Sequence, residues 1–250
     1  MNKFIIILII IFVFYCRIAN QKCKINIFKL SNRKIVKKID NNVYIVDNFY
    51  EDPYAVRNYA LKNKNNFKLH SALYNTQYYN PFLYANKSKE IIKFFERISG
   101  EKICDKVWNV DLIKESNGFI QYITQKSNPV VHKDLHWGVV VYLTPNADVS
   151  TGTSLYTHKK TGIKHVMECL DKKTNKPKDI CKLVKRDLWK EGEDSRINNW
   201  KVRHKIDNVF NRAIIFDGRN FHASNGGFGT NIESSRLFQT YFFSPQKKLM

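Results

Sequence analysis

The sequence predicts a mainly β fold, a double-stranded β-helix (jelly roll) core with N-terminal α-helices packed outside it. Two observations support this fold class. The second half of the 250-residue chain holds several short runs of β-branched and aromatic residues separated by polar turns, a pattern typical of antiparallel sheets. The first half holds two segments with helix start signals. The 43% apolar and 14% aromatic content indicates a packed core.

Two helices are predicted before residue 101. Asp52 is a good N-cap, and Pro53 follows it at the first helical position, so this helix is expected to run to about Lys62. Ser88 caps the second helix, whose apolar side chains recur on one face. Gly100 is a natural stop for it, because glycine tolerates the left-handed conformation that ends many helices.

The predicted strands are runs of β-branched or aromatic residues bounded by turn residues. One precedes the first helix, and the others follow the second helix, where the apolar period changes from helical to extended. Because the strands are short and the turns polar, antiparallel pairing is expected. The strands cover residues 42–46, 107–113, 118–124, 138–144, 153–157, 212–216 and 236–243.

A single domain is predicted over residues 41–250, because a chain of this length suffices for one sizeable core. Residues 20–40 are basic and are expected to form a linker or a first edge strand. Residues from about 158 to 199 are rich in Lys and Asp, and are expected to form a basic surface insertion. His158 and His165, at the start of that insertion, are expected to be solvated.

The first 19 residues predict a signal peptide or a signal anchor. A basic start precedes an apolar run over residues 4–15, which at about 1.5 Å per residue is too short to cross a hydrocarbon layer of ~30 Å. This is a signal-peptide pattern. Cleavage after Ala19 would place Arg17 where a small residue is preferred, so an anchor attached to a membrane through residues 4–15 stays open. The segment predicts a secretory, luminal or membrane-anchored protein, with a cytoplasmic location as the alternative.

The formal net charge of +20 has two interpretations. One is a partner that carries phosphates or an acidic surface. The other is a lysine-rich surface that keeps the protein soluble, which the spread of positive charge along the chain favours. No arginine–aromatic stripe of the kind that binds nucleic acids stands out. The composition therefore argues against a nucleic-acid partner without excluding one.

The five cysteines include no C-x-x-C pair, so the sequence gives no support for a zinc ribbon or a thioredoxin-type motif. Cys169 and Cys181 are close enough in sequence to form a disulfide bond if the chain enters an oxidising compartment. Free thiols are the alternative, and the spacing alone does not decide between the two.

His132 and Asp134 are two metal-ligand types at positions i and i+2. On an extended segment both side chains point to the same face, so both can reach one ion. His222 follows the predicted strand 212–216 and supplies a second imidazole. Two imidazoles and one carboxylate on one face leave coordination positions open, and this is the ligand set of non-haem Fe(II) oxygenases. The three residues therefore predict an iron site.

Arg236 opens the alternating strand 236–243. An arginine that projects from a strand into the interior needs a partner, because an unpaired buried charge is expensive. A carboxylate fits the guanidinium best. That carboxylate belongs either to a bound small molecule or to the protein itself, for which Asp217 and Glu233 are the candidates.

Short motifs between Gln121 and Phe243 resemble the catalytic core of the Fe(II)/2-oxoglutarate-dependent oxygenases, on the prolyl-4-hydroxylase-like side of that superfamily. The resemblance is closer to a group of bacterial and viral oxygenase-like proteins. All the motifs fall in the order that the family requires. They are VHKD (131–134), VYLTP (141–145), TGTSLY (151–156), NRAIIFDG (211–218), FHAS (221–224) and RLFQTYFF (236–243).

The resemblance implies that His132, Asp134 and His222 bind Fe(II). It further implies a dioxygenase that uses 2-oxoglutarate, hydroxylates a C–H bond of a peptidyl or small-molecule substrate, and releases succinate and CO2, with ascorbate as an optional reductant. Two alternatives stay open. Arg236 argues against a metal-dependent cupin-like enzyme without 2-oxoglutarate. The intact ligand set argues against a non-catalytic jelly-roll binding module, although a fold alone does not imply activity.

For the cosubstrate, the resemblance implies three contacts. Arg236 would bind the distal carboxylate of 2-oxoglutarate. Tyr122 resembles the family tyrosine that hydrogen-bonds the same carboxylate, with a core tyrosine as the alternative. Thr153 lies where the family places a small polar residue beside the cosubstrate. The basic insertion departs from the family pattern, and because insertions at that point often line the active-site mouth, the substrate stays open.

Overall fold

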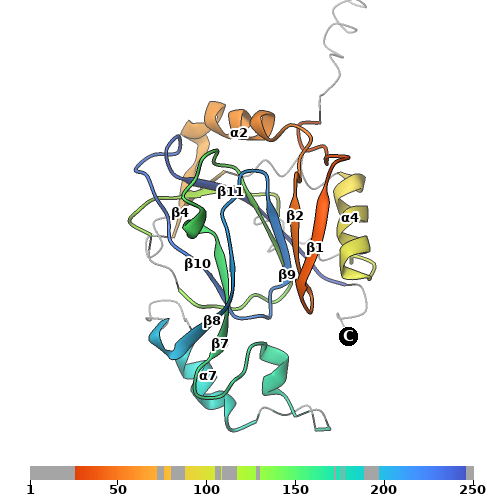
Figure 1. The fold of residues 1–250 in the computed structure, drawn as a ribbon, viewed down its shortest axis with the longest axis vertical. Coiled ribbons are helices and arrows are strands. Elements are labelled where there is room, and N and C mark those ends of the chain that lie inside the picture. The colour runs from red at the N-terminus through yellow and green to blue at the C-terminus, as the bar shows by residue number, and fades with distance from the viewer. Residues whose placement is uncertain are drawn as a thin grey trace, which may run out of the picture.

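The computed structural model describes residues 26–71, 76–79, 88–104, 108, 117–127, 130–171, 173–174, 176, 178–188 and 197–245. Within these ranges the chain forms two antiparallel sheets and three α-helices (Figure 1). The predicted mainly β class and the predicted antiparallel pairing are confirmed. The strand prediction over residues 107–113 lies outside the described residues, except for Trp108.

The larger sheet has eight strands in the order β1-β2-β9-β6-β11-β5-β4-β3, and the smaller has three in the order β10-β7-β8. The larger sheet contains β1 (Ile35–Asp40), β2 (Val43–Asp47), β3 (Lys68–Ser71), β4 (Thr76–Tyr79), β5 (Ile120–Ile123), β6 (Trp137–Tyr142), β9 (Ala213–Asp217) and β11 (Arg236–Phe243). The smaller sheet contains β7 (Thr153–His158), β8 (Trp200–Ile206) and β10 (His222–Ser224). β1 is an edge strand, one of the two forms expected for residues 20–40.

Both predicted N-terminal helix starts are confirmed at atomic detail. Helix α2 (Pro53–Lys62) begins where the Asp52 carboxylate accepts a hydrogen bond from Ala55 N at 2.9 Å. Helix α4 (Lys89–Ser99) begins where Ser88 Oγ accepts from Ile91 N at 3.3 Å. α4 ends at Gly100, which has a φ of +73°. The remaining helical elements are α7 (Cys181–Asp187) and the 3-10 turns Lys64–Asn66, Val149–Thr151, Val166–Cys169 and Ile197–Asn199.

The two faces of the larger sheet have different neighbours. On the outer face, Val56 and Ala60 of α2 and Phe95 of α4 pack in one cluster with apolar residues of β6, β9 and β11. On the inner face, strands β2, β5, β6, β9 and β11 pack against Leu155 and Ile206 of the smaller sheet. The inner face therefore forms the interior between the two sheets, and the candidate site lies there.

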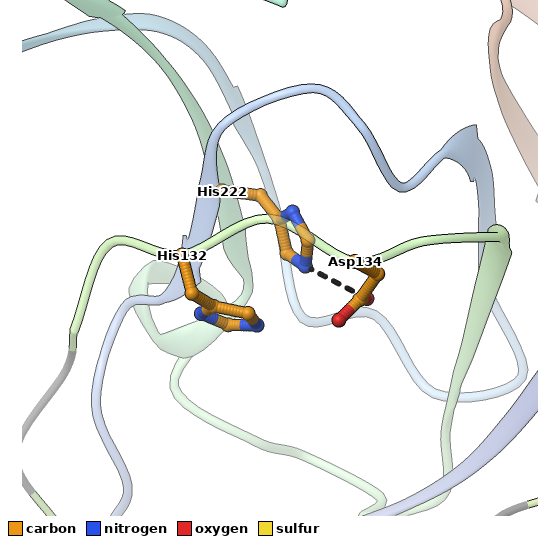
Figure 2. Close-up of side chains that lie close together, drawn as sticks. All are labelled: His132, Asp134 and His222. Atoms are coloured by element: carbon orange, nitrogen blue, oxygen red, sulfur yellow. Dashed lines mark ion pairs between the residues drawn. The ribbon is translucent and has the colours of Figure 1, made fainter. Parts of the chain in front are cut away.

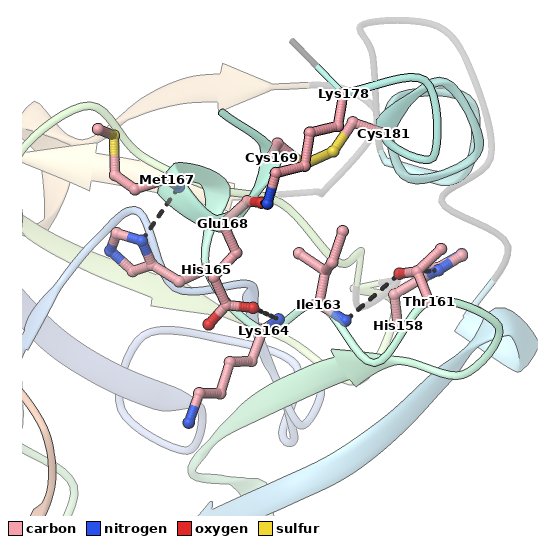
Figure 3. The surroundings of a disulfide bond; sticks show 10 residues. All are labelled: His158, Thr161, Ile163, Lys164, His165, Met167, Glu168, Cys169, Lys178 and Cys181. Atoms are coloured by element: carbon pink, nitrogen blue, oxygen red, sulfur yellow. Dashed lines mark hydrogen bonds between the residues drawn. A yellow bond between two sulfur atoms is a disulfide. The ribbon is translucent and has the colours of Figure 1, made fainter. Parts of the chain in front are cut away.

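The segment expected to be a surface insertion has a small core of its own. Cys169, Cys181 and Val184 pack against Trp200 and Phe221 on the smaller sheet. Cys169 and Cys181 form a disulfide bond with a Cα–Cα distance of 5.4 Å (Figure 3). In Figure 1 this segment, with α7, lies at the end of the molecule opposite α2.

The two histidines of this segment are not solvated, so that expectation was wrong. His158 is fully buried, with Nε2 at 3.1 Å from Asp187 and Nδ1 at 2.9 Å from Thr161 Oγ1. His165 is largely buried, and its Nε2 lies 3.3 Å from the carboxylate of Asp217. The carboxylate partner of His158 comes from α7 of the same segment, and that of His165 comes from β9 of the larger sheet.

None of the helices in the described ranges combines the length and the apolarity that crossing a bilayer would need. The predicted targeting segment, residues 1–19, and its apolar run lie outside the described residues.

Candidate metal centre

The site is built where two separate segments of the chain meet. His132 and His222 form an isolated antiparallel bridge, in which His132 N donates to His222 O at 3.0 Å and His222 N to His132 O at 2.9 Å. Asp134 N donates to Gly218 O at 2.8 Å. These backbone bonds hold the two segments side by side. As a result, the side chains of His132, Asp134 and His222 converge (Figure 2).

The three predicted ligand residues each offer one ligand atom, and these atoms all lie within 4.8 Å of one another. His222 Nε2 is 3.3 Å from Asp134 Oδ2, and the centroids of the two imidazole rings are 4.3 Å apart. In Figure 2 the His222 ring points toward the Asp134 carboxylate, and the dashed line marks this pair. A cluster of this size and composition can hold one metal ion.

Backbone carbonyls set the tautomer of both imidazoles. His132 Nδ1 lies 3.0 Å from Val130 O, and His222 Nδ1 lies 2.9 Å from Asn220 O. A carbonyl oxygen only accepts, so each Nδ1 carries the proton and donates. Each Nε2 then keeps its lone pair for the centre of the cluster. Metal-ligating histidines show this arrangement, with one nitrogen for the metal and the other bonded to the protein.

The local electrostatics favour a neutral His132 beside an ionised Asp134. Burial lowers the pKa of His132, and the neighbouring His222 lowers it further, so His132 is neutral near pH 7. Burial alone would raise the pKa of Asp134. The nearby His222, with smaller effects of His132 and Lys133, outweighs burial and holds that pKa below the usual value. The donor set therefore fits a divalent cation.

Gly218 is required for Asp134 to reach this place. A Cβ atom on Gly218 would lie 2.2 Å from the carbonyl oxygen of His136 and 2.7 Å from Asp134 Cβ. No side chain fits that space, so the approach of the two segments depends on this glycine. His136 itself does not join the cluster, because its Nδ1 is hydrogen-bonded to Ser244 Oγ.

Arg236 is buried on the inner face, with 2% of its surface exposed. Its Nε donates to Thr151 O at 2.7 Å and its Nη2 to Gly152 O at 3.2 Å, and its guanidinium lies 4.6 Å from the ring centroid of Phe238. Burial lowers its pKa. Within the described ranges, no carboxylate lies within ion-pair distance of this guanidinium.

Neither internal carboxylate proposed from the sequence pairs with Arg236. Asp217 is bound by Arg219 and His165, and Glu233 pairs with Lys64 at 2.8 Å. Both candidates named for an internal salt bridge with Arg236 are therefore paired elsewhere. Among the described residues, the guanidinium is bonded to two carbonyl groups and to the Tyr142 hydroxyl and has no carboxylate to balance its charge, which makes it a candidate site for a bound anion.

Thr153 and Tyr142 lie beside Arg236. Tyr142 Oη donates to Thr153 Oγ1 at 2.8 Å, and the Arg236 guanidinium carbon is 5.4 Å from the centroid of the Tyr142 ring. Leu155, two residues after Thr153 on β7, pairs directly with His222. Since residues i and i+2 of a strand share a face and lie about 7 Å apart, Thr153 is on the same face of β7 as Leu155, the residue that pairs with His222.

Tyr122 is placed elsewhere, and its predicted contact with the carboxylate partner of Arg236 is corrected. In the pairing of β5 with β11, Ile123 is opposite Arg236 and Tyr122 is opposite Leu237. Leu237 belongs to the outer cluster, and Tyr122 packs against it, with its ring 5.4 Å from that of Phe67. Tyr122 therefore lies on the face of the sheet opposite Arg236.

The tyrosine that does lie beside Arg236 is Tyr142, which sequence reasoning missed. Its position follows from strand pairing, since Tyr142 is opposite Phe238 and thus shares the face of Phe238 and Arg236. Only the register between β6 and β11 carries that signal, and spacing along the chain does not reveal it.

A family model described as "Family of unknown function (DUF6445)" matches residues 30–237. No curated protein matches the chain. Solved structures that resemble it include a prolyl hydroxylase from Trichoplax adhaerens in complex with a peptide fragment of the hypoxia inducible factor oxygen degradation domain (14% identity, 83% of this chain, 85% of that chain, TM-score 0.42). Another is HygX from Streptomyces hygroscopicus with nickel and 2-oxoglutarate bound (10% identity, 82% of this chain, 83% of that chain, TM-score 0.43). A third is a Pseudomonas putida prolyl-4-hydroxylase (10% identity, 82% of this chain, 93% of that chain, TM-score 0.39).

Proposed function

We propose that this chain, which belongs to the DUF6445 family, is an oxygenase that depends on Fe(II) and 2-oxoglutarate. One observation carries the proposal. The convergent ligand atoms of His132, Asp134 and His222 share the interior between the sheets with Arg236, a buried cation without a carboxylate partner in the described part of the chain.

The ligand set supports iron rather than a structural metal. Two imidazoles and one carboxylate are three protein ligands, and they leave further coordination positions open. Structural zinc sites are closed by four protein ligands, usually with cysteine among them. Among the described residues, His132, Asp134 and His222 form the one group of three or more ligand-type side chains that could hold a metal ion.

The arginine cluster supports an oxoacid with a second carboxylate. Arg236 offers a guanidinium in a site closed to water, where an anion gains most from a charge-assisted hydrogen bond. Thr153 and Tyr142 add hydroxyl groups next to it. Because Thr153 and Leu155 share one face of β7 and Leu155 pairs with His222, a small dicarboxylic acid is proposed to contact both places at once.

The bound metal and cosubstrate would supply the oxidation of a C–H bond by dioxygen, with release of succinate and CO2. The residues of this chain bind and orient. His132, Asp134 and His222 would hold the metal, and Arg236 would hold the distal carboxylate of the cosubstrate. Burial of His222 and Arg236 helps to exclude water from the reacting groups.

The proposed reaction is hydroxylation of a peptidyl or small-molecule substrate, with residues 41–250 forming one domain around a double-stranded β-helix. The double-stranded β-helix is supported by the two antiparallel sheets, which pack face to face across one apolar cluster. The segment around α7 covers the outside of the smaller sheet, behind the metal centre.

A succinate-formation assay with Fe(II), 2-oxoglutarate and dioxygen tests the proposal. Pools of peptides, nucleotides, glycans and amino acids serve as substrates, and Asp134→Ala serves as the matched inactive variant. Succinate above the background of Asp134→Ala, in at least one pool, is the expected result. Equal succinate from the wild type and from Asp134→Ala would contradict the proposed function.

A further inference from the structure

The orientation of His222 depends on one carbonyl group. His222 Nδ1 donates to the backbone oxygen of Asn220 at 2.9 Å. Asn220 is itself buried, with 4% of its surface exposed. Both its backbone N and its side-chain Nδ2 donate to Asp217 O, at 2.9 and 2.8 Å. The residue whose carbonyl fixes the tautomer of His222 is therefore anchored to Asp217 through both its backbone and its side chain.

The free end of that side chain is held by Arg203. Arg203 Nη2 donates to Asn220 Oδ1 at 2.8 Å, so the amide of Asn220 is bonded at both its oxygen and its nitrogen. The other end of the Arg203 fork, Nη1, pairs with the carboxylate of Asp40 at the end of β1. One guanidinium thus connects an edge of the larger sheet to the segment that carries His222.

A break in the strand register points Arg203 in this direction. In the pairing of β7 with β8, Tyr156 is opposite Val202 and Leu155 is opposite His204. Arg203 is the extra residue between them, which is the arrangement of a β-bulge. Bulges re-aim a side chain at the cost of ladder hydrogen bonding, and they are frequent next to active sites. Arg203 also carries a buried Nε with no hydrogen-bond partner among the described residues.

We propose that Arg203 is a positioning residue for His222, acting through Asn220, an inference that rests on the proposed metal site. The planar guanidinium fork holds Asp40 and Asn220 in fixed relative positions, which a flexible side chain would not do. Without it, the Asn220 amide keeps its bond to Asp217 O but loses the partner of its oxygen. The backbone carbonyl of Asn220 is then less well placed to accept from Nδ1, and the Nε2 lone pair of His222 is no longer aimed at the metal.

The two histidine ligands differ in how the carbonyl group that accepts from Nδ1 is held, so His132 serves as a reference for His222 in the same protein. His132 Nδ1 donates to Val130 O at 3.0 Å. Val130 has an apolar side chain, so no hydrogen bond to that side chain can brace its carbonyl. Loss of Arg203 should therefore disturb His222 and leave His132 unchanged.

The test compares Arg203→Met with wild type and with the control Arg212→Met. Arg212 forms a partly buried ion pair with Asp47 at 2.6 Å, and this pair is about as exposed as the Arg203–Asp40 pair. Asp47 lies at the end of the β1–β2 hairpin that is remote from Asp40. Two readouts are used: the ¹⁵N signals of the histidine rings in metal-free protein, which report the tautomer, and Co(II) affinity by visible absorption.

Arg203→Met should show a mixed tautomer at His222 with an unchanged one at His132, and roughly 10-fold or greater loss of Co(II) affinity, as for other residues that orient metal ligands. Arg212→Met should match wild type in both. A wild-type tautomer together with wild-type affinity in Arg203→Met would overturn the inference.

Arg203→Lys decides the matter if Arg203→Met does not fold cooperatively, because lysine keeps the pair with Asp40 but not the rigid fork. Wild-type behaviour of both readouts in Arg203→Lys would then count against the inference, and a mixed His222 tautomer with weaker Co(II) binding would support it. The failure of the proposed function looks different, since in that case wild-type protein itself binds no Co(II) at the three ligands.

Discussion

Asp134 and His136 lie two residues apart and face different partners. Asp134 Oδ2 lies 3.3 Å from His222 Nε2, whereas His136 Nδ1 is hydrogen-bonded to Ser244 Oγ. Both are ligand types, and on a regular strand both would face the same side. The structure brings only Asp134 into the cluster with His132.

The two residues should therefore respond differently to substitution. Asp134→Ala removes the one carboxylate ligand and should abolish Fe(II) binding, whereas His136→Ala should bind Fe(II) with wild-type stoichiometry. Metal content after anaerobic loading and desalting measures both. Loss of iron in His136→Ala, or its full retention in Asp134→Ala, would contradict the assigned ligand set.

Arg236→Met should weaken 2-oxoglutarate binding to the iron-loaded protein by about 30-fold or more. Removing a charge that is hydrogen-bonded to a buried partner costs at least about 2 kcal/mol. Calorimetric titration under anaerobic conditions measures the change. Tyr122→Phe is the control and should bind 2-oxoglutarate as wild type does, because Tyr122 lies on the opposite face of the sheet.

Asp217 should stabilise the fold in a pH-dependent way. Burial alone would raise the pKa of its carboxyl group, but hydrogen bonds from His165 and Arg219 hold the pKa well below its ordinary value. The folded pKa is thus lower than the unfolded pKa of about 3.9. The resulting stability is fully present above the unfolded pKa and is lost as pH falls toward the folded pKa.

Asp217→Asn should accordingly lower the free energy of unfolding by about 3 kcal/mol at pH 7, because it leaves the largely buried Arg219 and His165 without their carboxylate partner. Urea denaturation at pH 7, 5 and 3 measures the difference in the free energy of unfolding between wild type and Asp217→Asn, which is called the gap below. The gap should be equal at pH 7 and 5 and smaller at pH 3. A gap that does not shrink below pH 4 would show that the carboxylate charge is not its source.

The disulfide between Cys169 and Cys181 closes a short loop on the smaller sheet. In the chain-entropy model, a crosslink of this length stabilises the folded state by about 3 kcal/mol. The double variant Cys169→Ser/Cys181→Ser should therefore melt at a lower temperature than oxidised wild type. A reductant should lower the melting temperature of wild type and leave that of the double variant unchanged. Equal melting of oxidised and reduced wild type would speak against the bond.

Local signals in the sequence predicted much of the fold. The caps at Asp52 and Ser88 and the stop at Gly100 act within a few residues, and the structure confirms all three. Strand β8 was missed, because its sequence, WKVRHKI, carries four basic side chains and directly follows the segment interpreted as a surface insertion. Its basic residues project from an edge strand, where charge is tolerated.

Predicting the site required information that spacing does not hold. The i, i+2 rule placed His132 and Asp134 together, because it concerns one extended segment. The face on which a tyrosine lies depends on strand register, so Tyr122 was assigned and Tyr142 was missed. The contact of Arg203 with Asn220 joins distant segments through a bulge, and no local pattern predicts it.

The central claim is that one cluster binds Fe(II) and 2-oxoglutarate together. Anaerobic titration of the protein with Fe(II) and then 2-oxoglutarate, followed by visible absorption, tests it most directly. We predict a metal-to-ligand charge-transfer band that requires both additions, is absent in Asp134→Ala, and needs more 2-oxoglutarate to develop in Arg236→Met. Iron bound without any band on addition of 2-oxoglutarate would contradict the account and favour a metal-dependent enzyme without this cosubstrate, and no binding of either would favour a non-catalytic module.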